Sequence, residues 1–527
     1  MTTTFALPPE TVTRLDYGML RRVMVTLAMV LVVLSPLAPD PMAIAIGAFV
    51  PAVCVSIINT PTMPAAMFFF LFWQWMQTFA RAIQGIVDGM PMSRSVYGAA
   101  VEDAYWYMMA SIVVLAIAIR LVLGKIPAPT ERNRLAHLNW RPVDVFMVYL
   151  ASFVLNLVCL QIIRFVPSLY QQFDALGKLK TAILLLLFAN VLGHNRGYQF
   201  LFAALGIELV MGFTGLLAEF RGVFIVLAMS ALAARVKWSP ITTGFAVMWA
   251  VALLSLALFW TAVKQDYRSI ATQEDAFREE VTQEITASFE DRAGFIAGRI
   301  LNPDDIDWGD AAYALVARLA YVDIFGAVAS VAAFSKDEAP FLEQWGDALS
   351  HVFQPRFLFP NKPSLVDTAV FLKLTKADPT EFVRLSTSIS VGYMGENFAD
   401  MGFPGMLVGI FIVGSVIALV ARYFMTLKLP WMLREALVMG FVFTVAGTGV
   451  EASLPKILGA TVMFFVVYAL VVKFAFPTGL RWLNSRSEQA QELEDRIRRS
   501  QQQNRSEEHT SELQSHLNLV CRLLLEK

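Results

Sequence analysis

Apolar blocks of about twenty residues recur along this chain and constrain its fold more than any other feature. An α-helix of that length crosses a hydrocarbon core, where the backbone must satisfy its own hydrogen bonds. Of the 527 residues, 57% are hydrophobic and only 16% are charged. We therefore predict an all-α polytopic bundle with about twelve transmembrane helices. The predicted spans are residues 22–38, 41–58, 63–80, 104–123, 144–165, 179–194, 197–217, 221–235, 241–263, 403–424, 431–450 and 456–475.

Charge balance and reactive side chains exclude several classes of protein. The chain has 42 Lys and Arg against 43 Asp and Glu, so it has no basic field to attract nucleic acid. Three cysteines do not make a disulfide framework in a chain of this length. The sequence contains no HExxH, CxxC, GxxxxGK or GxSxG motif, and its histidines are scattered. We expect no nucleic-acid partner, no metal site and no cofactor.

The C-terminal residues 505–527 read RSEEHTSELQSHLNLVCRLLLEK and resemble a common sequencing-library adapter translated in frame. We treat this stretch as an artefact and exclude it from fold reasoning. The preceding Glu/Arg/Gln-rich stretch predicts a cytoplasmic helical tail. The expected organisation is an N-terminal transmembrane bundle at 1–263, a large loop at 264–402, C-terminal transmembrane helices at 403–477 and the helical tail at 478–504.

The distribution of positive charge over the short loops predicts the orientation. If the N-terminus is cytoplasmic, the inner loops carry twice as many Lys and Arg side chains as the outer ones. We therefore expect a multi-pass protein of the bacterial cytoplasmic (inner) membrane, with both termini in the cytoplasm.

The segment 264–402 departs from the apolar pattern. Its acidic residues outnumber its basic ones, and the predicted orientation makes it one large periplasmic loop. Residues 267–300 have the periodicity of a solvated amphipathic helix. Residues 311–334 are apolar over the length of a span but contain Arg318 and Asp323, each costing about 2.5–3.5 kcal/mol at the bilayer centre. We predict an interfacial or re-entrant helix there, because a true span would reverse everything downstream.

A proline-rich run at residues 354–363 (QPRFLFPNKP) offers cations on a stiff backbone. Its three prolines favour an extended chain that presents Arg356 and Lys362 among aromatic side chains. The planar guanidinium of Arg binds two phosphate oxygens at once. The alternative is an interfacial turn that binds lipid headgroups.

Two further places carry carboxylates at or inside the membrane. Glu396 and Asp400 lie one helical turn apart just before a predicted span, where a carboxylate could position or deprotonate a hydroxyl. Helix capping is the alternative. Glu208 lies in the middle of the predicted span 197–217, where an ionisable group is a functional hypothesis by default. The alternative there is pairing with an Arg of another helix.

The run E-x-F-x-D-M-G-F-P-G at residues 396–405 resembles a motif of the Wzy-type polymerases of O-antigen and exopolysaccharide repeat units. In that family a similar signature follows a large external loop and opens a late helix. The P-R-x-x-x-P-x-K-P run at 355–363, Arg221-Gly222 and Arg318 also resemble family elements. The sequence departs at Glu219, where the family often has Ser or Thr.

The resemblance implies a metal-independent glycosyl transfer at the periplasmic face of the inner membrane. An undecaprenyl-diphosphate-linked glycan would be moved onto another lipid-linked repeat unit, with membrane lipids and a chain-length regulator as further partners. Cations would neutralise the leaving diphosphate, and a base would take the proton of the acceptor hydroxyl. The expected diphosphate-binding residues are Arg221, Arg318, Arg356 and Lys362; the expected catalytic residues are Glu396 and His351, supported by Asp400 and Glu208.

Two rival functions remain. The first is an O-antigen ligase or a polyprenyl-phosphate-dependent glycosyltransferase of the C-type fold, favoured by the acidic pair Glu102-Asp103 at the outer start of the fourth predicted helix. The second is a lipid-linked oligosaccharide flippase or other transporter, which should show internal repeats or paired interrupted helices. We see no such repeat.

Overall fold

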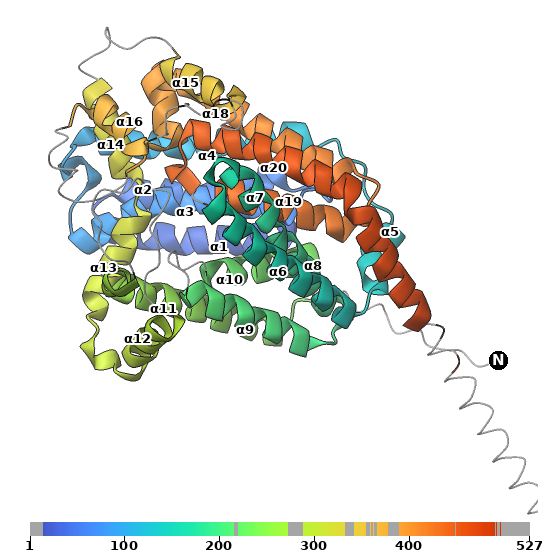
Figure 1. Cartoon of the computed structure of the whole chain (residues 1–527). Coiled ribbons are helices and arrows are strands. Elements are labelled where there is room, and N and C mark those ends of the chain that lie inside the picture. The colour runs from blue at the N-terminus through green and yellow to red at the C-terminus, as the bar shows by residue number, and fades with distance from the viewer. Residues whose placement is uncertain are drawn as a thin grey trace, which may run out of the picture.

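The computed structural model describes residues 14–214, 220–271, 288–332, 342–354, 366–377, 389–447 and 449–490, with the single residues 359, 362, 492 and 496. Every regular element within these residues is a helix, so the all-α prediction is confirmed (Figure 1). Arg356 and Glu219 lie outside the described residues, as does the stretch 505–527.

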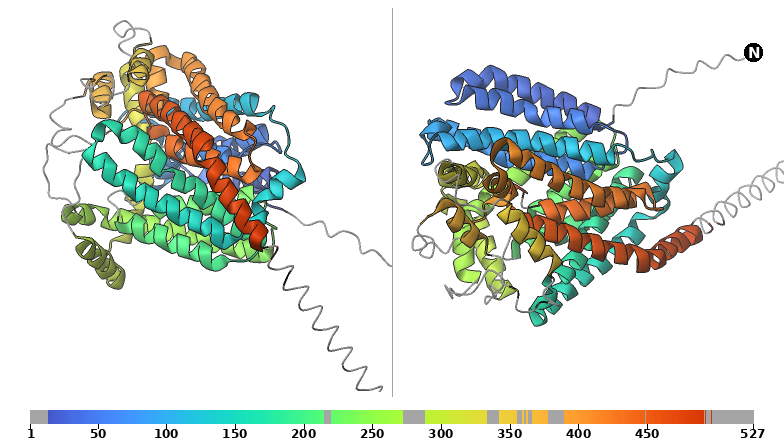
Figure 2. Two further views of the ribbon diagram at one scale, coloured as in Figure 1. Left: turned by 45° about the vertical axis from the view of Figure 1, so that its right-hand side comes forward. Right: turned by 90° about the horizontal axis from the view of Figure 1, so that it is seen from above.

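The N-terminal half of the chain supplies eleven numbered α-helices. They are α1 (Tyr17–Leu34), α2 (Pro41–Ile58), α3 (Ala65–Asp88), α4 (Ala99–Leu123), α5 (Glu131–Leu135), α6 (Pro142–Phe165), α7 (Tyr170–Gly177), α8 (Leu179–His194), α9 (Tyr198–Thr214), α10 (Phe220–Ala233) and α11 (Pro240–Ala271). The α1–α2 pair lies at one edge of the bundle (Figure 2, right).

The remaining helices divide into those of the large loop and those of the C-terminal part. The loop contains α12 (Phe289–Leu301), α13 (Trp308–Leu319), α14 (Val322–Ala332), α15 (Glu343–Phe353) and α16 (Asp367–Thr375). The C-terminal part contains α18 (Gly392–Thr426), α19 (Trp431–Ala446), the short helix η6 (Gly449–Glu451) and α20 (Leu454–Phe474).

Each of the twelve predicted spans falls on a helix, but not all of those helices are long and apolar enough to cross a membrane alone. Within the described residues eight pass that test, or nine if the bent pair α13–α14 is one span. The central helix α3 does not pass, and α9, α10 and α19 are shorter. The structure therefore supports a multi-pass membrane protein without confirming twelve spans.

One end of the bundle gathers the loops that the sequence predicts to be cytoplasmic, and we call it the basic end. Hydrogen bonds between distant loops hold it together. They join Leu15 N to Val236 O (2.9 Å), Asn133 Nδ2 to Leu429 O (3.4 Å) and Trp140 Nε1 to Asn484 Oδ1 (2.8 Å). Both described termini leave from this end, at the right of Figure 1.

The opposite end carries the large loop, and we call it the loop end. Helix α11 ends there, and α18 begins there with its Tyr393 N donating to Ala452 O over 2.7 Å. The chain therefore enters and leaves the α13–α14 segment at the same end. These two helices are bent by 50° at the break between Leu319 and Val322. This arrangement agrees with a re-entrant segment and not with a span that reverses the downstream topology.

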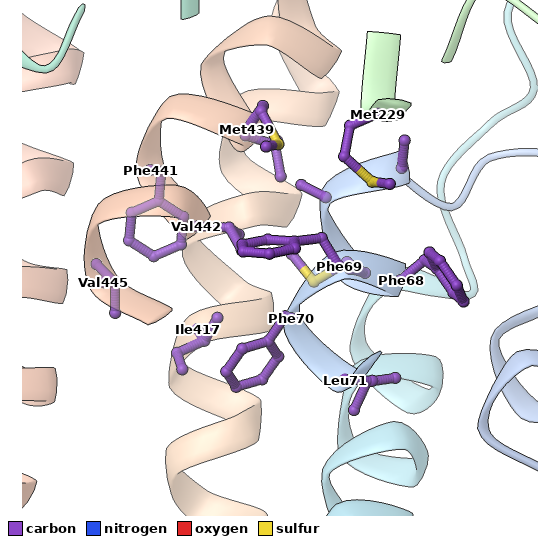
Figure 3. Close-up of a cluster of buried hydrophobic side chains, with 14 of the residues drawn as sticks. Phe68, Phe69, Phe70, Leu71, Met229, Ile417, Met439, Phe441, Val442 and Val445 are labelled. Atoms are coloured by element: carbon purple, nitrogen blue, oxygen red, sulfur yellow. The ribbon is translucent and has the colours of Figure 1, made fainter. Parts of the chain in front are cut away.

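The core is built around α3, which begins with the apolar run AAMFFFLF. Phe68 to Leu71 pack among side chains of α10, α18 and α19, so this part of the helix is apolar on every face (Figure 3). Further along, α3 becomes polar on one face. Gln74, Gln77, Thr78 and Arg81 are all buried and recur at the three- and four-residue spacing of one helix stripe. This stripe attaches the loop end to the core.

The close contact between α18 and η6 makes a specific prediction about glycine. Gly392 has φ +77°, and a Cβ there would collide with the carbonyl oxygen of Val450. Gly402 has φ +61° but open space around its Cβ position. Gly392→Ala should therefore suffer both backbone strain of about 1–2 kcal/mol and overpacking of about 1–3 kcal/mol. At Gly402 a ψ of −177° adds a different backbone strain, so Gly89, at φ +65° and ψ +20° with nothing within 4 Å of its Cβ position, is the matched control: Gly89→Ala should suffer the left-handed strain alone. Thermal melting in detergent should rank Gly392→Ala below Gly89→Ala; equal melting temperatures would contradict the packing at Val450.

The orientation in the membrane can be tested by thiol labelling. Cys54 and Cys159 are buried, so a Cys521→Ser background offers a low reactive thiol content. Asn302 at the loop end and Arg132 at the basic end are both exposed. An impermeant reagent should label Asn302→Cys in intact cells with a permeabilised outer membrane, and Arg132→Cys only after lysis. The reverse pattern would overturn the predicted orientation.

Candidate functional site

Gln77 connects three elements at the loop end. Its side-chain Nε2 donates to Glu451 Oε1 over 2.9 Å, and its Oε1 accepts from the backbone N of Val450 over 2.9 Å. Its carbonyl oxygen accepts from Tyr321 N at the α13–α14 break. The side-chain amide of Gln77 therefore holds the η6 turn against α3, and its backbone carbonyl holds the break between α13 and α14.

Glu451, the last residue of η6, is the centre of a charged cluster. Burial raises the pKa of its carboxyl above the usual value, although neighbouring cations and the bond from Gln77 oppose the shift. The cations are Arg318, Arg221 and Lys264, in order of effect. They come from α13, α10 and α11, so three helices contribute positive charge to the electrostatic environment of one carboxylate.

Two of these cations are accessible. Arg221 opens α10 and Arg318 lies in the last turn of α13, and both side chains are exposed. The Arg221 guanidinium lies 5.5 Å from the ring centroid of Trp73, a cation–π contact that orients it. The structure thus brings together two of the four predicted diphosphate-binding residues.

Glu396 lies in the first turns of α18 and is only 2% exposed. Its Oε2 accepts from the backbone N of Leu454, the first residue of α20, over 2.5 Å. A carboxylate at a helix N-terminus satisfies a free amide and favours the helix dipole. The capping interpretation therefore accounts for the contact that Glu396 makes.

Asp400 acts in the same way on a different helix. Its two carboxylate oxygens accept from the backbone N of Gln344 (2.9 Å) and of Trp345 (3.0 Å) in the first turn of α15. The indole of Trp345 donates to Asn397 Oδ1 over 2.9 Å. Residues of one turn of α18 thereby fix where α15 begins.

Lys362 and His351 meet at the other end of α15. Lys362 Nζ donates to the carbonyl oxygens of His351 and Gln354, the latter over 2.8 Å. A cation on the last carbonyls stabilises a helix C-terminus. The sequence predicted that Lys362 would bind diphosphate with Arg221 and Arg318, whereas here it is engaged by α15.

Glu208 has partners inside the bundle. Its carboxylate accepts from Lys180 Nζ over 2.8 Å and from the Tyr149 hydroxyl over 2.9 Å. The alternative considered for Glu208, pairing with a cation of another helix, is present, but the partner is a lysine of α8 and not an arginine. Both charged side chains are at most 16% exposed, so the pair satisfies two groups that would be costly alone in lipid.

The sequence did not single out Glu451, Gln77 or Lys264. A weak signal existed for Glu451, because the turn G-V-E lies between two apolar helices where a carboxylate needs a partner. Gln77 and Lys264 lie within helices, and their meeting depends on packing between elements. Comparisons of the chain with protein-family models, curated proteins and solved structures found no match.

The capping role of Asp400 predicts a local effect. Asp400→Ala should raise amide hydrogen exchange across Glu343–Phe353 by about fivefold, because an N-cap contributes roughly 1 kcal/mol. Asp400→Asn keeps one acceptor oxygen and is the matched control, with a smaller increase expected. Unchanged exchange in the alanine variant would show that the carboxylate does not hold α15.

Proposed function

We propose that this chain is a membrane glycosyltransferase that polymerises polyprenyl-diphosphate-linked oligosaccharide repeat units at the loop end. The observation that carries the proposal is the favourable electrostatic effect of Arg318, Arg221 and Lys264, which lie on three helices, on the carboxyl of Glu451. Guanidinium and ammonium groups from separate helices suit a diphosphate, which needs several donors around two phosphoryl groups. The resemblance of residues 396–405 to a polymerase motif supports the same class of reaction.

In the proposed reaction, the acceptor hydroxyl oxygen forms a bond with the anomeric carbon of the donor sugar. The bond from that carbon to the diphosphate oxygen breaks, and polyprenyl diphosphate leaves with the electron pair. Arg221, Arg318 and Lys264 stabilise the negative charge on the leaving group, an effect that is large where water is scarce. The hydroxyl proton passes to a carboxylate and then to solvent.

We assign the proton acceptor to Glu451 in preference to Glu396. Glu396 is buried and already accepts from Leu454 N, whereas Glu451 is partly exposed beside the cations. Burial raises the pKa of Glu451, which makes its carboxylate a better base at neutral pH. Glu396 and Asp400 then act by placing α20 and α15 around the site, and His351 remains a candidate only through its place on α15.

The substrates and location follow from the same proposal. The loop end would face the periplasm of the bacterial inner membrane, where lipid-linked repeat units are the substrate. Membrane lipids and a chain-length regulator would be further partners.

One observation favours a second candidate, an O-antigen ligase or a C-type glycosyltransferase. Glu102 and Asp103 are exposed in the first turn of α4, which begins at the loop end. This alternative requires an accessible acidic pair, which that fold carries in the first external loop, whereas here the pair falls in the second. Variants of the pair separate the two candidates.

Complementation of a deletion strain tests the polymerase directly. Glu451→Gln should lower polymer yield by about 10²-fold or more, the usual contribution of a general base, and single repeat units should accumulate on lipid. Arg318→Gln should also lower polymer yield and cause single repeat units to accumulate. Glu131→Gln, an exposed carboxylate at the basic end, is the matched control and should be neutral. Protein levels are equalised by quantitative immunoblotting.

The pattern of products separates the candidates. Polymer that is made but not attached to its acceptor, together with a loss of activity in Glu102→Gln, would favour the ligase. The pH profile tests Glu451 itself: Arg318 lowers the pKa of that carboxyl, so Arg318→Gln should raise it further. The acid limb of activity should then move to higher pH. Normal polymer yield in Glu451→Gln would remove this residue from the mechanism.

A further inference from the structure

A cavity of about 180 Å³ lies at the basic end, on the opposite side of the bundle from Glu451. Its walls come from the starts of α1, α3 and α19, the end of α10, the α2–α3 turn and α5. The polar and charged side chains that line it include those of Thr60, Arg134, Arg235 and Glu435. The proposed glycosyl transfer uses none of them.

Helix termini give this cavity a positive character. Tyr17, Ala65 and Trp431 are the first residues of α1, α3 and α19, and all three line it. The N-terminus of a helix carries partial positive charge, so three of them at one space favour negatively charged groups. Asp16 and Glu435, which also line the cavity, already occupy two of these termini.

The two carboxylates near the cavity are already engaged by these termini. Asp16 Oδ1 accepts from Met19 N over 2.8 Å and caps α1. Glu435 is 4% exposed, and its Oε2 accepts from Ala65 N, the first amide of α3, over 3.0 Å.

The two guanidinium groups are differently placed. Arg134 and Arg235 are half-buried and line the cavity, and no ion pair within 4.0 Å joins either to a carboxylate among the residues that the structure describes. Arg235 Nη2 donates to Pro61 O over 3.3 Å. The hydroxyl oxygen of Thr60 is buried without a hydrogen-bond partner. Hydrogen-bond donors thus line a cavity whose two carboxylates, Asp16 and Glu435, already accept hydrogen bonds from backbone amides.

Arg235 also occupies a backbone position that favours glycine. Its φ is +50°, and the bonds from Val236 N to Ala231 O and from Arg235 N to Leu232 O (both 3.1 Å) form the turn that ends α10. Such a turn places its residue in the left-handed region, usually as glycine. A strained position that carries an arginine, and not glycine, points to a use for the side chain.

We propose that this cavity binds the phosphate group of a phosphate mono- or diester, held by Arg134 and Arg235 at the basic end. The planar guanidinium groups donate to the phosphate oxygens, and the helix N-termini and the Thr60 hydroxyl face the same space. The volume exceeds that of a phosphate alone and leaves room for part of an esterified group. A lipid headgroup and a soluble phosphate compound share this chemistry.

The test uses the full chain purified in detergent and compares Arg235→Gly and Arg134→Gln with the wild type. Arg235→Gly relieves the backbone strain, so a loss of binding cannot be attributed to unfolding of the turn. Arg132→Gln, an exposed neighbour on α5 that does not line the cavity, is the control. Melting temperature is measured against inorganic phosphate and glycerol 3-phosphate at ionic strength held constant with chloride. Native mass spectrometry after reconstitution compares phosphatidylglycerol with phosphatidylcholine.

Arg235→Gly and Arg134→Gln should each weaken phosphate binding at least tenfold, whereas Arg132→Gln should not. A thermal response to the soluble phosphates supports a soluble ligand. Retention of phosphatidylglycerol over phosphatidylcholine, lost in the two variants, supports a lipid headgroup. The proposal is overturned if the wild type responds to none of these probes, or if the two variants bind as the wild type does. These binding measurements do not depend on glycosyl transfer at the loop end, so their outcome is independent of the proposed function.

Discussion

The bond between Gln77 and the η6 turn is the interaction on which the loop end depends. In a bundle that excludes water, each buried polar group must find a partner within the protein. Gln77 uses its amide for Glu451 and Val450 and its carbonyl for Tyr321. The side-chain amide therefore positions the carboxylate of the site, and the backbone carbonyl of the same residue holds the break that follows Arg318. In the proposed site the carboxylate of Glu451 accepts a hydrogen bond from Gln77, so it is not an isolated buried charge.

Carboxylates at the loop end follow a second rule, which is that helix N-termini attract them. Glu396 holds the start of α20, and Asp400 holds the start of α15. Each bond joins α18 to an element that is distant in sequence. A motif rich in acids can therefore be required for activity without touching substrate, because it sets where the surrounding helices begin. The partly exposed carboxylate of Glu451 differs in this respect, since it is surrounded by cations.

The sequence was sufficient for much of the fold and for less of the site. Apolar periodicity located the helices, because lipid-facing and buried surfaces both demand apolar residues over a defined length. The charges of Arg318 and Asp323 predicted an interfacial or re-entrant helix at residues 311–334; the structure has two helices there bent by 50°, and Asp323 pairs with Arg81 of α3. Arg221 and Arg318 both act electrostatically on the carboxyl of Glu451, whereas Lys362 is held by α15. Glu451 and Lys264 were missed because which helix faces which is decided by tertiary packing.

Helix α3 also relates the two ends of the molecule. Ala65 begins it at the cavity of the basic end, and Gln77 lies twelve residues further on at the charged cluster. At 1.5 Å per residue the two positions are about 18 Å apart along one rigid element. A ligand that orders the start of α3 would act on the same helix that carries Gln77. The two sites therefore share one rigid helix, α3, and use different residues of it.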